Sequence, residues 1–202
     1  MNKLKNKLIH FIDQFSQYSI IGLYFWLFMF RSGFIYGFFP AAIGLIKSIR
    51  ELSREDGNTS VKAIYTNAFH EFKQQKWVSF LLFLFTGISL MSLYSFLFTE
   101  YPFLGFIQIP LIILTCMLWI FSVYSVYFLS QEEKKSNNIK WIYALAFDTC
   151  IRRPINSVVI CLTLLALCLL IKINLIVFIF FAPPLFVMLT KRIVYIPSIL
   201  LR

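Results

Sequence analysis

The sequence predicts an all-α protein: a polytopic transmembrane helix bundle of about five spans, with amphipathic helices at the cytoplasmic surface of the membrane. Of its 202 residues, 59% are hydrophobic and only 14% are charged, whereas soluble domains carry roughly 25% charged residues. The charges are clustered, so residues 78–98, 103–129, 155–171 and 173–190 contain none. Because about 20 apolar residues cross the hydrocarbon core as a helix that satisfies its own backbone, we expect an integral protein of the lipid bilayer.

The first 46 residues are predicted to form an interfacial helix and then a long first span. In residues 1–18, apolar side chains recur at helical spacing, which favours a helix lying at the membrane surface. The span is predicted over residues 19–46 as one helix, and this places the N-terminus outside. The alternative is two half-length helices, broken at Arg31–Gly33, that form a re-entrant hairpin. That alternative keeps the N-terminus, with Lys3, Lys5 and Lys7, in the cytoplasm.

Basic residues set the expected topology of the rest of the chain. After Pro40 the sequence becomes amphipathic, and residues 47–76, which hold six Lys and Arg residues, are predicted to form cytoplasmic helices. Residues 130–154, which hold five, are predicted to form a further cytoplasmic helix. We expect a hairpin of two spans over 77–129, a second hairpin over 155–190 and a cytoplasmic tail over 191–202. The whole chain is then a single membrane domain.

The two basic segments share a motif. Residues 62–69 read KAIYTNAF and residues 140–147 read KWIYALAF, so both fit K-x-I-Y-x-x-A-F. An apolar hairpin follows each, which indicates a parallel repeat of one interfacial helix plus one hairpin. The constraints that any two aromatic-rich interfacial helices share would also explain the likeness. If the repeat is real, the two helices offer a surface on which a partner docks, and its candidate residues are Lys62, Tyr65, Phe69, Lys140, Tyr143 and Phe147.

Arg31 is the candidate for an intramembrane polar or anion site, because it lies near the middle of the predicted first span. An arginine at such a depth costs about 2.5–3.5 kcal/mol on insertion scales, so we expect its side chain to face protein, water or an anion. No Asp or Glu lies deep in a predicted span to pair with it. Its partner is then either a carbonyl, Ser or Tyr group of the bundle, or a bound anion, or a carboxylate of another chain.

The sequence lacks the motifs of enzymes, cofactor sites and metal sites. It has no Gly-Lys-Ser/Thr phosphate loop, no nucleophile elbow and no HExxH, so we predict a protein that is not an enzyme and has no catalytic residue, cofactor or metal. The four cysteines lack metal-ligand spacing and are interpreted as buried free thiols. The net charge of +10 does not indicate nucleic acid, because the basic residues lie at the ends of apolar runs.

Three stretches of the chain are similar to segments of one known family. GFFPAAIGLIKSIRELSRE (residues 37–55) is similar to a G-x-F-P-A-x-x-A-L … R … L-x-R-G-E segment. FHEFKQQKWVSFLLF is similar to an F-x-x-x-F-K-x-N stretch, and AFDTCIRRPINSVVICLTLL to an A-x-x-x-x-x-R-N/R-P stretch. These segments resemble those of the YesL-like bacterial membrane proteins, the family of unknown function numbered six hundred and twenty-four. The chain departs from the family at Arg31, where an apolar residue is expected, and at Gly57, which is displaced from R-G-E.

The resemblance implies a setting rather than a mechanism. Members are commonly encoded beside carbohydrate importers of the ATP-binding-cassette type in Gram-positive bacteria, which implies a multi-pass protein of the bacterial plasma membrane. We therefore expect a non-enzymatic accessory or regulatory component that associates with the permease subunits of such an importer. The alternative is a self-contained small transporter or channel that acts as a homo-oligomer, and a third interpretation is a membrane sensor. The chain lacks the E-A-A-x-x-x-G coupling loop with which a permease docks its ATPase.

Overall fold

The computed structural model describes residues 2–53, 60–97, 103–131 and 139–194, and within these ranges all regular structure is helical. One short 3-10 turn, η1 (Lys73–Gln75), joins α3 to α4. The α-helices in chain order are α1 (Asn2–Arg31), α2 (Phe38–Leu52), α3 (Val61–Glu71), α4 (Lys76–Leu97), α5 (Phe103–Gln131), α6 (Ile139–Arg152), α7 (Pro154–Ile173) and α8 (Leu175–Val194).

Among the described residues, four helical segments are long and apolar enough to cross a membrane: residues 73–95, 108–131, 154–173 and 175–194. They coincide with the two hairpins predicted from the charge-free stretches, and the all-helical membrane-bundle class is confirmed. The last span continues to Val194, so the first four residues of the predicted tail are helical. The predicted turn over residues 99–102 and the tail from residue 195 lie outside the described residues.

The predicted first span is wrong, because the chain reverses where that helix should continue. α1 is one helix from Asn2 to Arg31, which also removes the boundary expected at residue 18. Gly33 then adopts a φ of 74°, a left-handed conformation that favours glycine, and α2 begins at Phe38 and packs back against α1. Pro40 lies in the first turn of α2, where its missing N–H leaves no hydrogen bond unmade. It therefore helps to start a new helix rather than bending a long one.

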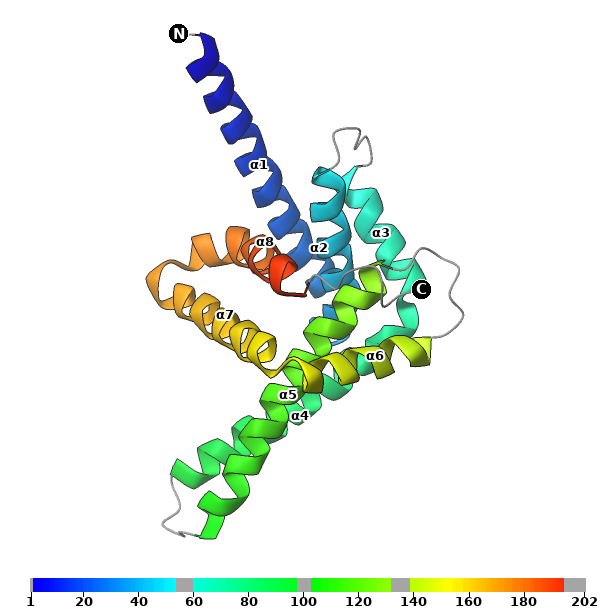
Figure 1. Cartoon of the computed structure of the whole chain (residues 1–202), viewed down its shortest axis with the longest axis vertical. Coiled ribbons are helices and arrows are strands. Elements are labelled where there is room, and N and C mark those ends of the chain that lie inside the picture. Colours follow the sequence, from blue (N-terminus) through cyan, green and yellow to red (C-terminus); the bar gives the residue numbers. More distant parts are fainter. Residues whose placement is uncertain (1, 54–59, 98–102, 132–138, 195–202) are drawn as a thin grey trace.

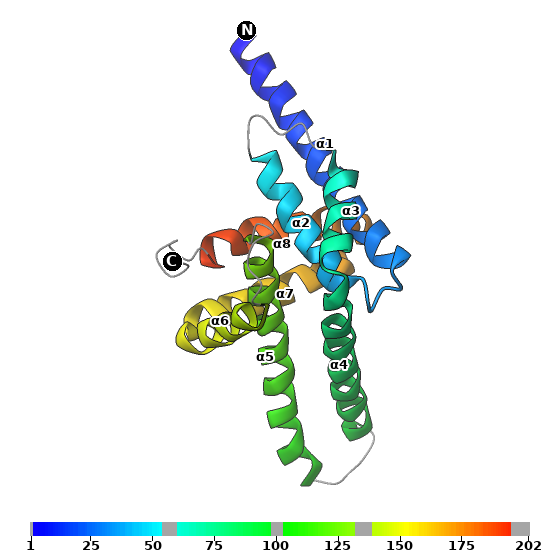
Figure 2. The same cartoon turned by 90° about the vertical axis from the view of Figure 1, so that its right-hand side faces the viewer.

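In the part of the chain that the structure describes, the helices form three consecutive hairpins, α1/α2, α4/α5 and α7/α8 (Figure 1). α3 packs against α2, and α6 packs against α5. Both views draw α4 and α5 along the long axis of the molecule, whereas α7 and α8 lie across it (Figure 2). α1 and α2 contact α8, and α2 also contacts α5, so the first hairpin lies between the other two.

The α1/α2 hairpin predicts the side of the membrane on which the N-terminus lies. α2 has 15 residues and is therefore about 22 Å long, which is less than the ~30 Å hydrocarbon core. We expect a re-entrant hairpin, with residue 2 and the end of α2 on the cytoplasmic side, as the basic residues near the N-terminus favour. Asn2→Cys, in a chain whose four native cysteines are replaced by serine, should react with a membrane-impermeant maleimide only after the cells are opened. Labelling of Asn2→Cys in intact cells would place the N-terminus outside and would favour a first segment that crosses the membrane completely.

Candidate functional site

Arg31 lies at the end of α1 rather than in the middle of a span. It is the last residue of the helix and is exposed, next to the turn that leads to α2. A cation at a helix C-terminus interacts favourably with the helix dipole. The expectation that Arg31 lies near the middle of a span rested on one continuous helix over residues 19–46, and it is wrong together with that helix. The polar or anion site at Arg31 stays a prediction.

Tyr65 of α3 is completely buried between the two helices of the first hairpin. Its ring stacks on Phe28 of α1 at a centroid distance of 5.3 Å, and its hydroxyl donates to the carbonyl oxygen of Ile21 at 3.1 Å. On α2 the ring faces Gly44, where an added Cβ would lie 2.7 Å from Tyr65 Cδ1. The glycine therefore makes the space that the tyrosine fills. Phe69 follows one turn later, half-buried, with its ring 5.3 Å from that of Phe28.

Tyr143 of α6 is the motif equivalent of Tyr65 and is only half-buried. Its ring lies 6.0 Å from that of Phe121 on α5, and its hydroxyl donates to the side-chain oxygen of Gln75, next to the start of α4. Phe147 is 56% exposed, with one contact to Phe121 at a centroid distance of 6.5 Å. Burial raises the pKa of both Tyr65 and Tyr143, so both hydroxyls stay protonated.

The two motif helices thus occupy similar positions with respect to the hairpin that precedes each of them. Each packs on the second helix of that hairpin, and its tyrosine hydroxyl reaches a residue of the first helix or beside its start. The parallel repeat of one interfacial helix plus one hairpin stays a prediction. The side chain of Tyr65 is buried and not accessible to a partner. In α3 the tyrosine of the motif therefore contributes to packing within the bundle.

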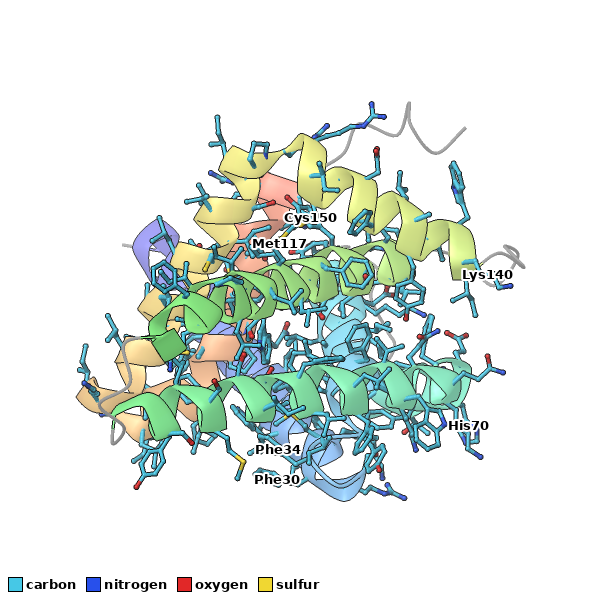
Figure 3. All side chains as sticks on the ribbon, turned by 90° about the horizontal axis from the view of Figure 1, so that it is seen from below. Phe30, Phe34, His70, Met117, Lys140 and Cys150 are labelled. Carbon is cyan, nitrogen blue, oxygen red and sulfur yellow. The ribbon has the colours of Figure 1, made fainter. Side chains whose placement is uncertain are left out.

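The outward faces of the two helices differ in polarity. On α3 the outward residues are polar and include Lys62, Thr66, Asn67 and His70. On α6 the exposed residues include Trp141 and Ile151, which are 59% and 54% exposed, besides Phe147 and Lys140. In the view from below, His70 and Lys140 lie toward the same side of the molecule (Figure 3). The sequence analysis does not single out Trp141 and Ile151, although Trp141 lies within the motif, next to Lys140, and Ile151 lies four residues after Phe147.

A cavity of about 190 Å³ lies among α1, α2, α5, α7 and α8. Its wall is almost wholly apolar and includes Trp26, Phe38, Trp119 and Phe186. Polar groups at its edge already have partners within the protein. Trp26 Nε1 donates to the carbonyl oxygen of Ile179 at 2.8 Å, and the Tyr127 hydroxyl donates to that of Val187 at 2.9 Å. The cavity therefore suits an apolar group and offers little to the hydroxyls of a sugar.

Within the described ranges, no three His, Cys, Asp or Glu side chains come together in a way that would hold a metal ion. The four cysteines are free. Cys150, on α6, is buried, and burial raises the pKa of its thiol, which disfavours the reactive thiolate. Cys168, in contrast, is exposed on α7, so the expectation of four buried thiols is wrong there.

The fold and these features define a helical membrane protein that has, within the described ranges, four candidate spans, preceded by the α1/α2 hairpin, whose second helix is short. Residues 18–97 match the model of the family described as "Protein of unknown function, DUF624". The match covers the stretch from within α1 to the end of α4 and supports the resemblance to that family of unknown function. The narrower YesL-like description stays a prediction. No curated protein and no solved structure matches the chain.

Proposed function

We propose that this protein is a non-enzymatic accessory or regulatory component of a larger assembly in the bacterial plasma membrane. The assembly that the family resemblance favours is a carbohydrate importer of the ATP-binding-cassette type, with its permease subunits as partners. The observation that supports a partner is the outward face of α6, whose large apolar side chains have no cover within the described chain. Aromatic side chains of this kind are the usual anchors of protein interfaces.

The outward faces of α3 and α6 differ in polarity, and this difference supports a partner at α6. Both helices are short, both pack on the second helix of a hairpin, and both contain the same motif. A helix that faces only water needs a polar outer face, and α3 has one. α6 instead exposes Trp141, Phe147 and Ile151. Lys140, Asp148 and Arg152 are exposed on the same helix, but exposed apolar side chains of this size still indicate contact with a protein or with the membrane interface.

The central cavity favours this function over a self-contained sugar transporter. A sugar site needs several converging hydrogen-bonding groups, and the wall of the cavity is almost wholly apolar. The homo-oligomeric transporter or channel remains the alternative outcome of the test that follows.

Replacing Trp141 and Phe147 by serine should remove the partner without unfolding the chain, since both side chains are exposed. Each anchor of an interface contributes about 2 kcal/mol, so we expect at least a thirtyfold weaker association with the permease. The measurement is quantitative mass spectrometry of permease subunits that co-purify in mild detergent from the cells that make the protein. The matched control is Thr66→Ala with Asn67→Ala on the polar face of α3, which should retain the permease.

Three results would contradict the proposal. If only further copies of this chain co-purify, the homo-oligomer is favoured. If permease retention is the same in both double variants, α6 is not the docking surface. If no permease is found with the unaltered chain, the importer association is wrong, and α6 is better explained as a helix lying in the headgroup region.

A further inference from the structure

A groove of about 710 Å³ lies on the outside of the bundle, where the last half of α8 meets α1 and α2. Its apolar part is formed by Leu185, Met188 and Leu189 of α8 and by Ile49 of α2, and Tyr18 of α1 contributes one wall. Leu185, Met188 and Leu189 are exposed. α8 packs against α1 and α2, and Figure 1 draws the three helices together.

Lys191 and Arg192 provide the charge of the groove. Both line it, and both are exposed in the last turn of α8. In the part of the chain that the structure describes, neither has an ion-pair partner, and no lining residue is acidic. The carbonyl groups at the helix C-terminus stabilise these cations only modestly, which leaves both able to bind an anion.

The apolar and basic residues follow one another along α8 in the order that an amphiphile requires. Leu185 precedes Lys191 by six residues, which is about 9 Å along the helix axis. The apolar side chains lie within a predicted span, and the cations lie where that span ends. A ligand with a negative headgroup and a hydrocarbon chain matches both parts at once. A small soluble anion would leave the apolar part uncovered.

We propose that this groove binds an anionic phospholipid. The phosphate lies between Lys191 and Arg192, and the first part of one acyl chain lies along Leu185, Met188 and Leu189. Basic pockets at the ends of transmembrane helices recognise lipid headgroups by this combination of charge and apolar surface. This site is separate from the α6 face and does not depend on the proposed partner.

The test measures binding of dioctanoyl phosphatidylglycerol to the full chain in neutral detergent, by native mass spectrometry and by the shift in melting temperature. Dioctanoyl phosphatidylcholine and glycerol 3-phosphate are the comparison ligands, the first without net charge and the second without acyl chains. We expect phosphatidylglycerol to bind most tightly. Lys191→Gln with Arg192→Gln should weaken its binding about thirtyfold, since each basic residue near an anionic lipid contributes roughly fivefold.

The matched control is Lys73→Gln with Lys76→Gln, which removes the same charge near the start of α4. Leu185→Gln with Leu189→Gln should also weaken binding of phosphatidylglycerol while the two cations remain. Equal binding of phosphatidylcholine and phosphatidylglycerol would overturn the proposal, and so would an equal loss in the control. Binding of glycerol 3-phosphate as tight as that of phosphatidylglycerol would show a simple anion site instead.

Discussion

Gly22→Ala should separate α1 from α8 and strongly destabilise the protein. A Cβ atom at Gly22 would lie 2.0 Å from the carbonyl oxygen of Phe180 and 2.9 Å from its carbonyl carbon. Both are backbone atoms, so no change of rotamer relieves the overlap and one helix must move. Overpacking of a close interface costs about 1–3 kcal/mol and occasionally more, and we expect a loss at or above the upper end of that range.

Thermal unfolding in mild detergent, followed by tryptophan fluorescence, measures this effect. Trp26 lies one turn after Gly22 and donates a hydrogen bond to Ile179, so its environment reports on the same interface. Gly87→Ala is the matched control, because a Cβ atom there meets no heavy atom within 4 Å. Alanine is favoured over glycine in a helix by about 1 kcal/mol, so this variant should be as stable as the unaltered chain or more so. If the two variants are equally stable, α1 and α8 are not in backbone contact.

The sequence predicts the later spans well, because these depend on composition alone. A charge-free run over residues 78–98 predicts α4, which extends from Lys76 to Leu97, and the run over 155–171 predicts α7, which extends from Pro154 to Ile173. A sufficiently long apolar segment can cross the membrane whichever helices it packs against. Its length and its flanking charges are therefore enough to predict the span. Packing partners are not needed for that prediction.

The first hairpin and its packing on α8 could not be predicted in the same way, because they depend on three glycines and their neighbours. Gly33 allows the turn, Gly37 approaches the backbone of Met29, and Gly22 approaches that of Phe180. Hydropathy does not distinguish such glycines from others in an apolar run, of which Gly87 is an example. The polar pair Arg31–Ser32 before Gly33 is the signal that the sequence offers, and it supports the alternative of two helices broken at Arg31–Gly33.

The candidate docking residues were found by their motif, but the motif does not determine which of them are exposed. Tyr65 and Tyr143 occupy the same motif position, yet Tyr65 faces Gly44 whereas Tyr143 packs beside Phe121. A glycine opposite the ring lets the helices approach, and a phenylalanine keeps them apart. The partner residue on the neighbouring helix therefore decides burial, and no feature within the eight-residue motif reveals it.

Because Tyr65 is fully buried and Tyr143 is only half-buried, their truncation should destabilise the protein to different degrees. Tyr65→Ala should cost about 3–5 kcal/mol, because truncating a fully buried aromatic side chain leaves a cavity between α1, α2 and α3. Tyr65→Phe should cost about 1 kcal/mol, since it removes only the hydrogen bond to Ile21. Tyr143→Ala should cost clearly less than Tyr65→Ala, because Tyr143 is only half-buried. The measurement is again thermal unfolding in mild detergent.

A double-mutant cycle with Gly44 tests the reason for that cost. Gly44→Ala alone should be destabilising, because its Cβ would lie 2.7 Å from a ring that Phe28, Tyr24 and Ile21 hold in place. In the Tyr65→Ala background the ring is absent, so the same substitution should cost almost nothing and partly fill the cavity. Residues in direct contact typically couple by about 0.5–3 kcal/mol, and we expect a value near the upper end. Additive effects of Gly44→Ala and Tyr65→Ala would mean that α3 does not dock over Gly44, since only the ring makes the two substitutions interdependent.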